Sequence, residues 1–175
     1  MYRGTVTVKE DGKVVAQLPL TVTVKNRVLP PSSEWAFHLD LWQNPYAVAR
    51  YYNVEPFSQE HFDLMRPIMK RYADAGGKVI TTSIMHKPWN GQTYDPFESM
   101  VTWMKKADGT WWFDYTVFDK WVEFMMSCGV KKEIGCYSMV PWRLSFQYFD
   151  QASNSFKFFN GKPGEPAYEE FWTRM

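Results

Sequence analysis

Beyond residue 34, short apolar β-runs alternate with amphipathic helical segments, and this alternation restricts the fold more than any other feature of the sequence. The β-runs are predicted at 35–42, 78–85 and 133–139, and helices at 58–75, 117–128 and from 165 onward. Strands alternating with helices are typical of a parallel α/β arrangement, and eight such units close a (β/α)8 barrel in about 250 residues. The sequence therefore predicts an α/β fold holding about the first three βα units of a partial TIM barrel, with exposed edges on strands one and three.

Two further segments, 100–115 and 145–159, are predicted to be hairpins inserted into this order. The first contains Trp103, Trp111 and Trp112. These tryptophans either cap a neighbouring helix or form a wall of a ligand cleft, and the sequence leaves both open.

The first 25 residues differ from the rest of the chain. Residues 2–9 and 14–24 alternate polar and apolar side chains around an Asp-Gly turn, so they predict a hairpin. Because a lone hairpin is marginal in water, we expect 1–25 to be the C-terminal hairpin of a β-sandwich domain. A polar, proline-containing linker at 26–34 and the barrel part at 35–175 complete the predicted organisation.

Charge and hydropathy exclude several partners. The chain has 20 basic and 19 acidic residues and a net charge of +1, which gives no reason to expect nucleic acid, and no apolar run could span a membrane. The first residues lack the apolar stretch of a signal peptide, so an exported parent protein would carry its signal upstream. Two cysteines, Cys128 and Cys136, are predicted to be buried thiols, with a disulfide left open.

Aromatic residues make up 18% of the chain, including nine tryptophans. An excess of large amphipathic rings indicates either an unusually Trp-rich core or surfaces that stack on flat ligands such as sugars. In a βα barrel the active face lies at the carboxyl ends of the strands. The side chains predicted to bind a sugar in one hollow there are His38, Asp40, Trp42, His86, Trp89, Tyr137 and Trp142.

Each of these residues also has a plainer interpretation. His38 and Asp40 share a strand face at a spacing of two, so they could be a structural hydrogen-bonded pair. Metal binding by His38, Asp40 and His86 matches no strong ligand spacing, and we predict neither a metal nor a cofactor. Glycosidases commonly use two carboxyl groups. No second strand-end carboxylate pairs convincingly with Asp40, so no catalytic residue is predicted.

Four segments together resemble glycoside hydrolase family 123: LPLTVTVKNRVLP, HLDLWQNPYAVARYYNVEPFS, GGKVITTSIMHKPWNGQTYDPF and IGCYSMVPW. The resemblance implies a β-N-acetylgalactosaminidase with a (β/α)8 barrel behind a β-sandwich. It also implies a retaining mechanism in which the substrate's 2-acetamido oxygen attacks the anomeric carbon, assisted by an adjacent Asp-Glu pair. That pair is expected on the next barrel strand, and no Asp-Glu dipeptide occurs in these 175 residues.

The sequence therefore predicts a fragment of an exported bacterial glycosidase that acts on N-acetylhexosamine-containing glycans and is inactive by itself. One alternative is a non-catalytic carbohydrate-binding or interaction module. Another is a structural domain whose open sheet edges pair with a second copy to form a homodimer.

Overall fold

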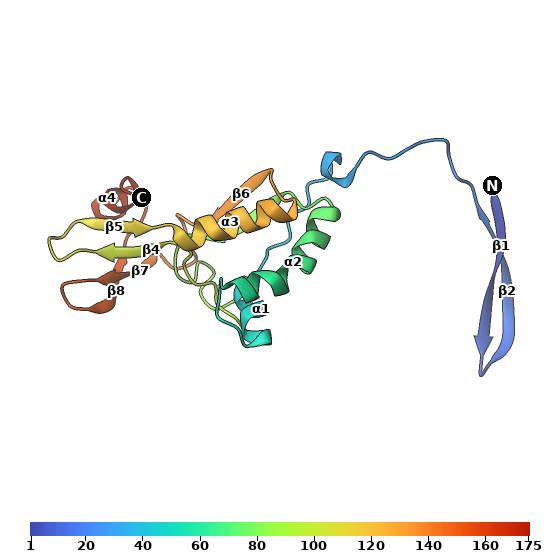
Figure 1. Cartoon of the computed structure of the whole chain (residues 1–175), viewed down its shortest axis with the longest axis horizontal. Coiled ribbons are helices and arrows are strands. Elements are labelled where there is room, and N and C mark those ends of the chain that lie inside the picture. The colour runs from blue at the N-terminus through green and yellow to red at the C-terminus, as the bar shows by residue number, and fades with distance from the viewer. The chain divides into compact units, whose positions relative to one another are not determined.

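A computed structural model describes all 175 residues and divides the chain into two compact units, 1–31 and 32–175 (Figure 1). The first unit is an antiparallel hairpin of β1 (Tyr2–Glu10) and β2 (Lys13–Val22). Asp11 and Gly12 form its turn with φ of 47° and 78°, the positive values that an Asp-Gly turn adopts. The predicted hairpin is thus confirmed, and every residue of both strands is exposed.

The second unit combines helices and strands, so the prediction of an α/β fold is confirmed. After a 3-10 turn at Ser32–Glu34, its elements are α1 (Pro45–Tyr52), α2 (Gln59–Asp74), β3 (Val79–Ser83), β4 (Thr102–Lys105), β5 (Trp111–Asp114), α3 (Thr116–Cys128), β6 (Glu133–Tyr137), β7 (Ser145–Asp150), β8 (Ser155–Asn160) and α4 (Pro166–Trp172). No helix among them is both long enough and apolar enough to cross a membrane.

β3 and β6 form a parallel pair, with Val79 opposite Glu133 and Ser83 opposite Tyr137. All five residues of β3 are buried, whereas β6 is largely exposed. The chain crosses between them through the β4–β5 hairpin and α3, which lies beside them (Figure 1). The carboxyl ends of both strands therefore meet at one edge of the pair.

The predicted strand at 35–42 is wrong, because only one parallel bridge forms there, between Leu39 and Gly77. A side chain supplies hydrogen bonds to backbone groups that a strand ladder would otherwise have paired. The Tyr72 hydroxyl donates toward the carbonyls of Leu39 (3.1 Å) and Val79 (3.0 Å). A β-carbon on Gly77 would lie 2.4 Å from the Tyr72 ring, so this close approach requires glycine.

The two inserted hairpins join into one sheet of order β5-β4-β7-β8. The joining contact is a short parallel pairing of β4 with β7, which the sequence did not predict. Behind this sheet α4 buries Phe171, whose ring centroid is 4.0 Å from that of Trp103 and 5.0 Å from that of Trp111. Trp103 and Trp111 therefore pack against a helix, Trp103 also lines a small cavity of about 210 Å³, and Trp112 is exposed.

Local sequence signals set the ends of α2 and α3. These helices pack with β3 in a hydrophobic core that is separate from the one between the hairpin sheet and α4. The Ser58 hydroxyl caps α2 by accepting from the His61 N–H, and Gly129 ends α3 at a φ of 114°. The buried faces of α2 and α3 meet through residues such as Met65 and Trp121. Both cysteines are free, and Cys136 is exposed on β6, which corrects its predicted burial.

Candidate functional site

Three of the predicted sugar-binding residues form one aromatic cluster near the carboxyl ends of β3 and β6. The ring centroid of Trp42 lies 4.5 Å from that of Trp89 and 5.1 Å from that of Tyr137, and Trp89 and Tyr137 are 4.8 Å apart. Trp89 is 8% exposed and Trp42 is 49% exposed. The cluster therefore presents the open face of Trp42, with Trp89 packed behind it as a support.

Asp40 adds a polar group near this cluster. Its Oδ1 is buried and has no hydrogen-bonding partner in the protein. Burial raises the pKa of Tyr137, the negative charge of Asp40 raises it further, and a hydrogen bond with the Trp42 side chain opposes both effects. A buried carboxylate oxygen without a partner is costly, so Asp40 is an unexplained polar group beside the cluster.

Gln43 fixes the backbone that carries Trp42. Its Oε1 accepts from the Thr81 N–H at 2.8 Å, and its Nε2 donates to the carbonyl of Val79 at 3.2 Å and to that of Leu41. The side-chain amide thus imitates a neighbouring peptide group along the edge of β3. Sequence reasoning did not include Gln43 among the site residues, and no motif distinguishes this role from that of a surface glutamine.

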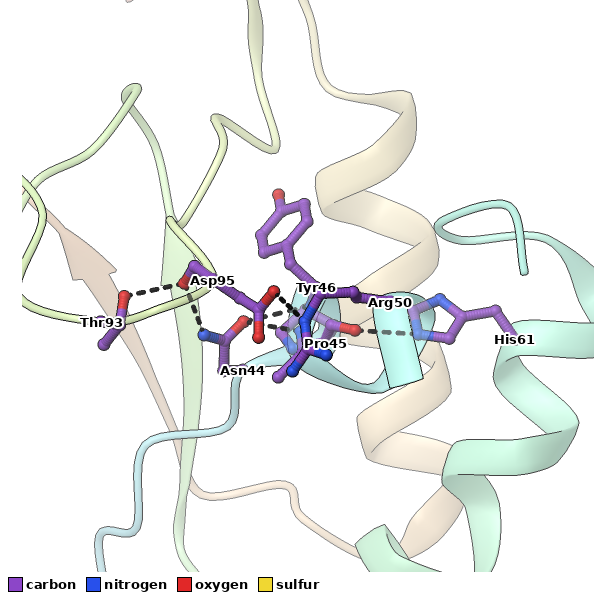
Figure 2. Close-up of polar contacts among 8 residues, drawn as sticks. Asn44, Pro45, Tyr46, Arg50, His61, Thr93 and Asp95 are labelled. Atoms are coloured by element: carbon purple, nitrogen blue, oxygen red, sulfur yellow. Dashed lines mark hydrogen bonds and ion pairs between the residues drawn. The ribbon is translucent and has the colours of Figure 1, made fainter. Parts of the chain in front are cut away.

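The loop after β3, which carries Trp89, is tied to α1 by the contacts in Figure 2. Asn44 caps α1 through Oδ1 and donates from Nδ2 to the Asp95 carbonyl at 3.0 Å. Arg50 pairs with the Asp95 carboxylate at 2.6 Å, and Thr93 donates to the Asp95 carbonyl at 2.8 Å. Asp95 is therefore a structural anchor of this loop.

His61 supports the same region from α2 (Figure 2). It is fully buried, its Nδ1 accepts from the Phe57 N–H at 2.9 Å, and its Nε2 lies 3.0 Å from the Pro45 carbonyl. These partners require a proton on Nε2 and none on Nδ1, which is the neutral imidazole. Burial lowers the pKa of His61, opposed by the hydrogen bond to Pro45.

Three predicted residues lie outside the cluster. His38 precedes the bridge at Leu39 and lies 3.8 Å from Glu133, the first residue of β6. His38 therefore lies at the amino ends of β3 and β6. Its neighbour Leu39 pairs with Gly77, which precedes the first residue of β3. His86 turns to Glu98, with Nδ1 2.5 Å from the carboxylate. Trp142 is exposed, but its backbone N–H donates to the Pro88 carbonyl, next to Trp89, at 3.0 Å.

The His38–Asp40 pair predicted as an alternative does not form, since His38 contacts Glu133. No group of three or more His, Cys, Asp or Glu side chains is arranged to hold a metal ion. A cavity of about 550 Å³ lies between α2 and α3 and is lined by Phe62, Arg66 and Phe124 among others. It is away from the strand ends and shares no residue with the aromatic cluster.

Comparison with known proteins found a family and a solved structure that match this chain. The family described as the catalytic domain of glycoside hydrolase 123 matches residues 42–175. A solved structure of a family 123 glycoside hydrolase from Clostridium perfringens, studied for glycolipid glycan hydrolysis, is 35% identical with a TM-score of 0.87. The similarity covers 99% of this chain and 31% of that one, so this chain spans about a third of its relative's length. No curated protein matches the chain. The family match and the similarity to this enzyme show that the chain belongs to glycoside hydrolase family 123.

Proposed function

We propose that the cluster of Trp42, Trp89 and Tyr137 is the part of a glycosidase site that holds an N-acetylhexosamine residue of a glycan. The observation that carries this proposal is the convergence of three rings from three separate segments, with one broad face left open. Sugar rings present C–H surfaces that stack on such a face, and a few polar groups then orient the hydroxyls.

Each member of the cluster has a distinct role in this proposal. Trp42 stacks on the sugar, and Trp89 and Tyr137 hold its ring in place from the protein side. Asp40, whose charge acts on Tyr137, supplies the negative charge at the edge of the cluster.

The family membership supports a finer proposal for the whole enzyme. We infer β-N-acetylgalactosaminidase-type chemistry that is retaining and substrate-assisted, carried out in a (β/α)8 barrel in which β3 and β6 are neighbouring strands. The N-terminal hairpin is proposed as part of a β-sandwich, because paired apolar residues such as Val6 and Leu18 form one exposed face. An exported bacterial enzyme fits this assignment.

For the 175-residue polypeptide alone, we propose binding without hydrolysis. The mechanism needs an adjacent Asp-Glu pair to position the acetamido group and to exchange the proton, and the sequence contains no such dipeptide. An aryl N-acetyl-β-galactosaminide tests this, with the Clostridium perfringens family member as positive control. Turnover by the purified polypeptide would refute the proposed inactivity.

Binding is tested by titrating N-acetylgalactosamine into the ¹⁵N-labelled chain and following the tryptophan indole signals. We expect the Trp42 signal to shift, and Trp42→Ala to weaken binding about tenfold, or ~1.4 kcal/mol. Trp112→Ala is the matched control, since Trp112 is 41% exposed on β5 and lies outside the cluster. Equal affinity for the two variants would rule out the cluster as the sugar site.

A further inference from the structure

The hairpin sheet, of strand order β5-β4-β7-β8, carries apolar side chains on both of its faces (Figure 1). One face holds Trp103, Phe146 and Phe159 and packs against α4. An antiparallel sheet that is covered on one side commonly turns polar side chains to water on the other. The face of this sheet that points away from α4 departs from that pattern.

A row of apolar side chains crosses all four strands on the face away from α4. Trp112 on β5 is opposite Met104 on β4, and Met104 is opposite Phe149 on β7. Phe149 is in turn opposite Phe156 on β8. Directly opposed residues point to the same side of a sheet, and so does Phe158, two residues after Phe156. These five residues are called the outer face below.

Much of the outer face is open to water. Phe156 is 67% exposed, Phe158 is 56% exposed and Trp112 is 41% exposed. A large aromatic side chain has about 150–250 Å² to bury, so these three rings leave roughly 300 Å² of apolar surface uncovered on each copy of the chain. Single exposed apolar residues are ordinary, whereas a contiguous patch of this size is typical of an interaction surface.

Two charges of opposite sign lie at opposite ends of the outer face. Asp114 is two residues beyond Trp112 on β5, and Lys106 is two residues beyond Met104 at the other end of the hairpin. The Lys106 N–H donates to the Thr110 carbonyl at 2.8 Å, so the pairing of the hairpin continues to this residue. Alternation along each strand therefore places both charges on the outer face.

Both charges are available to a partner, because neither forms an ion pair within the chain. The Thr116 hydroxyl and backbone N–H donate to Oδ1 of Asp114 at 2.5 and 2.9 Å. These hydrogen bonds hold the pKa of Asp114 below its usual range, so the carboxylate is ionised at neutral pH. Asp108, in the same turn as Lys106, is instead held by the hydroxyl and N–H of Thr110 at 2.7 and 2.9 Å.

This distribution of charge makes the outer face complementary to itself. A two-fold axis that lies between two stacked sheets and perpendicular to their strands reverses the strand direction of one sheet relative to the other. The apolar row of one copy then faces the same row of the other copy. Each Lys106 comes across from the Asp114 of the other copy, one strand over. A two-fold interface requires this kind of self-complementarity, with an apolar centre and a polar rim.

We propose that the outer face is the interface of a homodimer in which two hairpin sheets pack face to face. Sheets stacked in this way lie about 10 Å apart. Covering the three exposed rings of both copies removes roughly 600 Å² from water, about half of the ~1,200 Å² at which specific interfaces begin. Met104, Phe149 and the polar rim supply the remainder. The inference does not depend on the sugar site.

Sedimentation equilibrium of the full 175-residue chain over a range of concentrations measures the dimerisation constant. Phe158→Ser should weaken dimerisation about tenfold, because it removes an exposed ring from each copy at the centre of the interface. Tyr51→Ser is the matched control, since Tyr51 is 74% exposed on α1 and lies outside the hairpin sheet. Circular dichroism reports whether each variant is folded.

A charge exchange tests the two-fold arrangement. Lys106→Glu and Asp114→Lys each place like charges across the interface, so each variant alone should dimerise several-fold more weakly. An equimolar mixture of the two variants should restore dimerisation, because every pair across the interface then has opposite signs again. Mixing cannot repair a purely structural defect in β4 or β5.

The outcomes separate this interface from other surfaces. Loss of the dimer in Phe158→Ser but not in Tyr51→Ser, with recovery in the mixture, supports the proposal. A monomer at every concentration overturns it, and a dimer that Phe158→Ser leaves unchanged overturns it in favour of another surface, such as the β6 edge. Weakened single variants without recovery overturn the two-fold arrangement. A shift of the Trp112 indole signal on addition of N-acetylgalactosamine also overturns the proposal, because the outer face would then bind a ligand.

Discussion

Replacing Gln43 with leucine tests whether side chains substitute for the predicted first strand. Leucine fills the buried position but cannot accept from the Thr81 N–H, which Gln43 now satisfies at 2.8 Å. A buried N–H without a partner costs about 1–3 kcal/mol. The Val79 carbonyl keeps the Tyr72 hydroxyl at 3.0 Å, so its loss of Gln43 adds little. We therefore expect about 2 kcal/mol of destabilisation, or ~4–8 °C in Tm for a chain of this size.

The assay is thermal and urea unfolding of the full chain followed by circular dichroism, with Gln92→Leu in the exposed loop as the matched control. An unchanged urea m-value would show that the native state stays compact. If Gln43→Leu unfolds at the same temperature as Gln92→Leu, the Gln43 amide does not act as the partner of β3.

Three further predictions concern stability and assembly. Because burial lowers the folded-state pKa of His61 below its unfolded value of about 6.5, the unfolded chain takes up this proton first. The free energy of unfolding should thus fall as pH drops below about 6.5 and stop falling below the folded pKa, and urea titrations should show a shallower pH dependence for His61→Gln. Gly77→Ala should cost about 1–3 kcal/mol in thermal melts, because its β-carbon would lie 2.4 Å from the Tyr72 ring; Gly91→Ala, with nothing within 4 Å, should be neutral. Light scattering should show a homodimer if the exposed β6 edge pairs with a second copy, and a monodisperse monomer would count against it.

Local chemistry made much of the fold predictable from the sequence. The Asp-Gly turns, the Ser58 cap and the glycine after α3 each depend on a few adjacent residues, and each element they bound is present. The buried run at 78–85 also contains β3, because β-branched residues directly after a glycine pair favour a buried strand. These signals carry no information about which distant segments pair.

The parts that could not be predicted depend on long-range contacts. The 35–42 segment has the composition of a buried strand, yet Gln43 and Tyr72 satisfy the groups at the edge of β3 that it would have paired with. The parallel joining of β4 with β7 depends on how two hairpins meet, which neither hairpin encodes alone. His86 was predicted to share one hollow with Trp89, but a loop carboxylate, Glu98, draws it into a separate cavity.

These long-range contacts have a consequence for the candidate site. Trp42 and Trp89 both lie on irregular backbone, where no strand ladder fixes their positions. Side-chain amides take that role: Gln43 holds the Trp42 segment against β3, and Asn44 holds the Trp89 loop through Asp95. Adjacent residues thus position both rings of the 4.5 Å stack. Loss of the Gln43 contacts should therefore weaken sugar binding as well as stability, because the open face of Trp42 would no longer be held in register with its support.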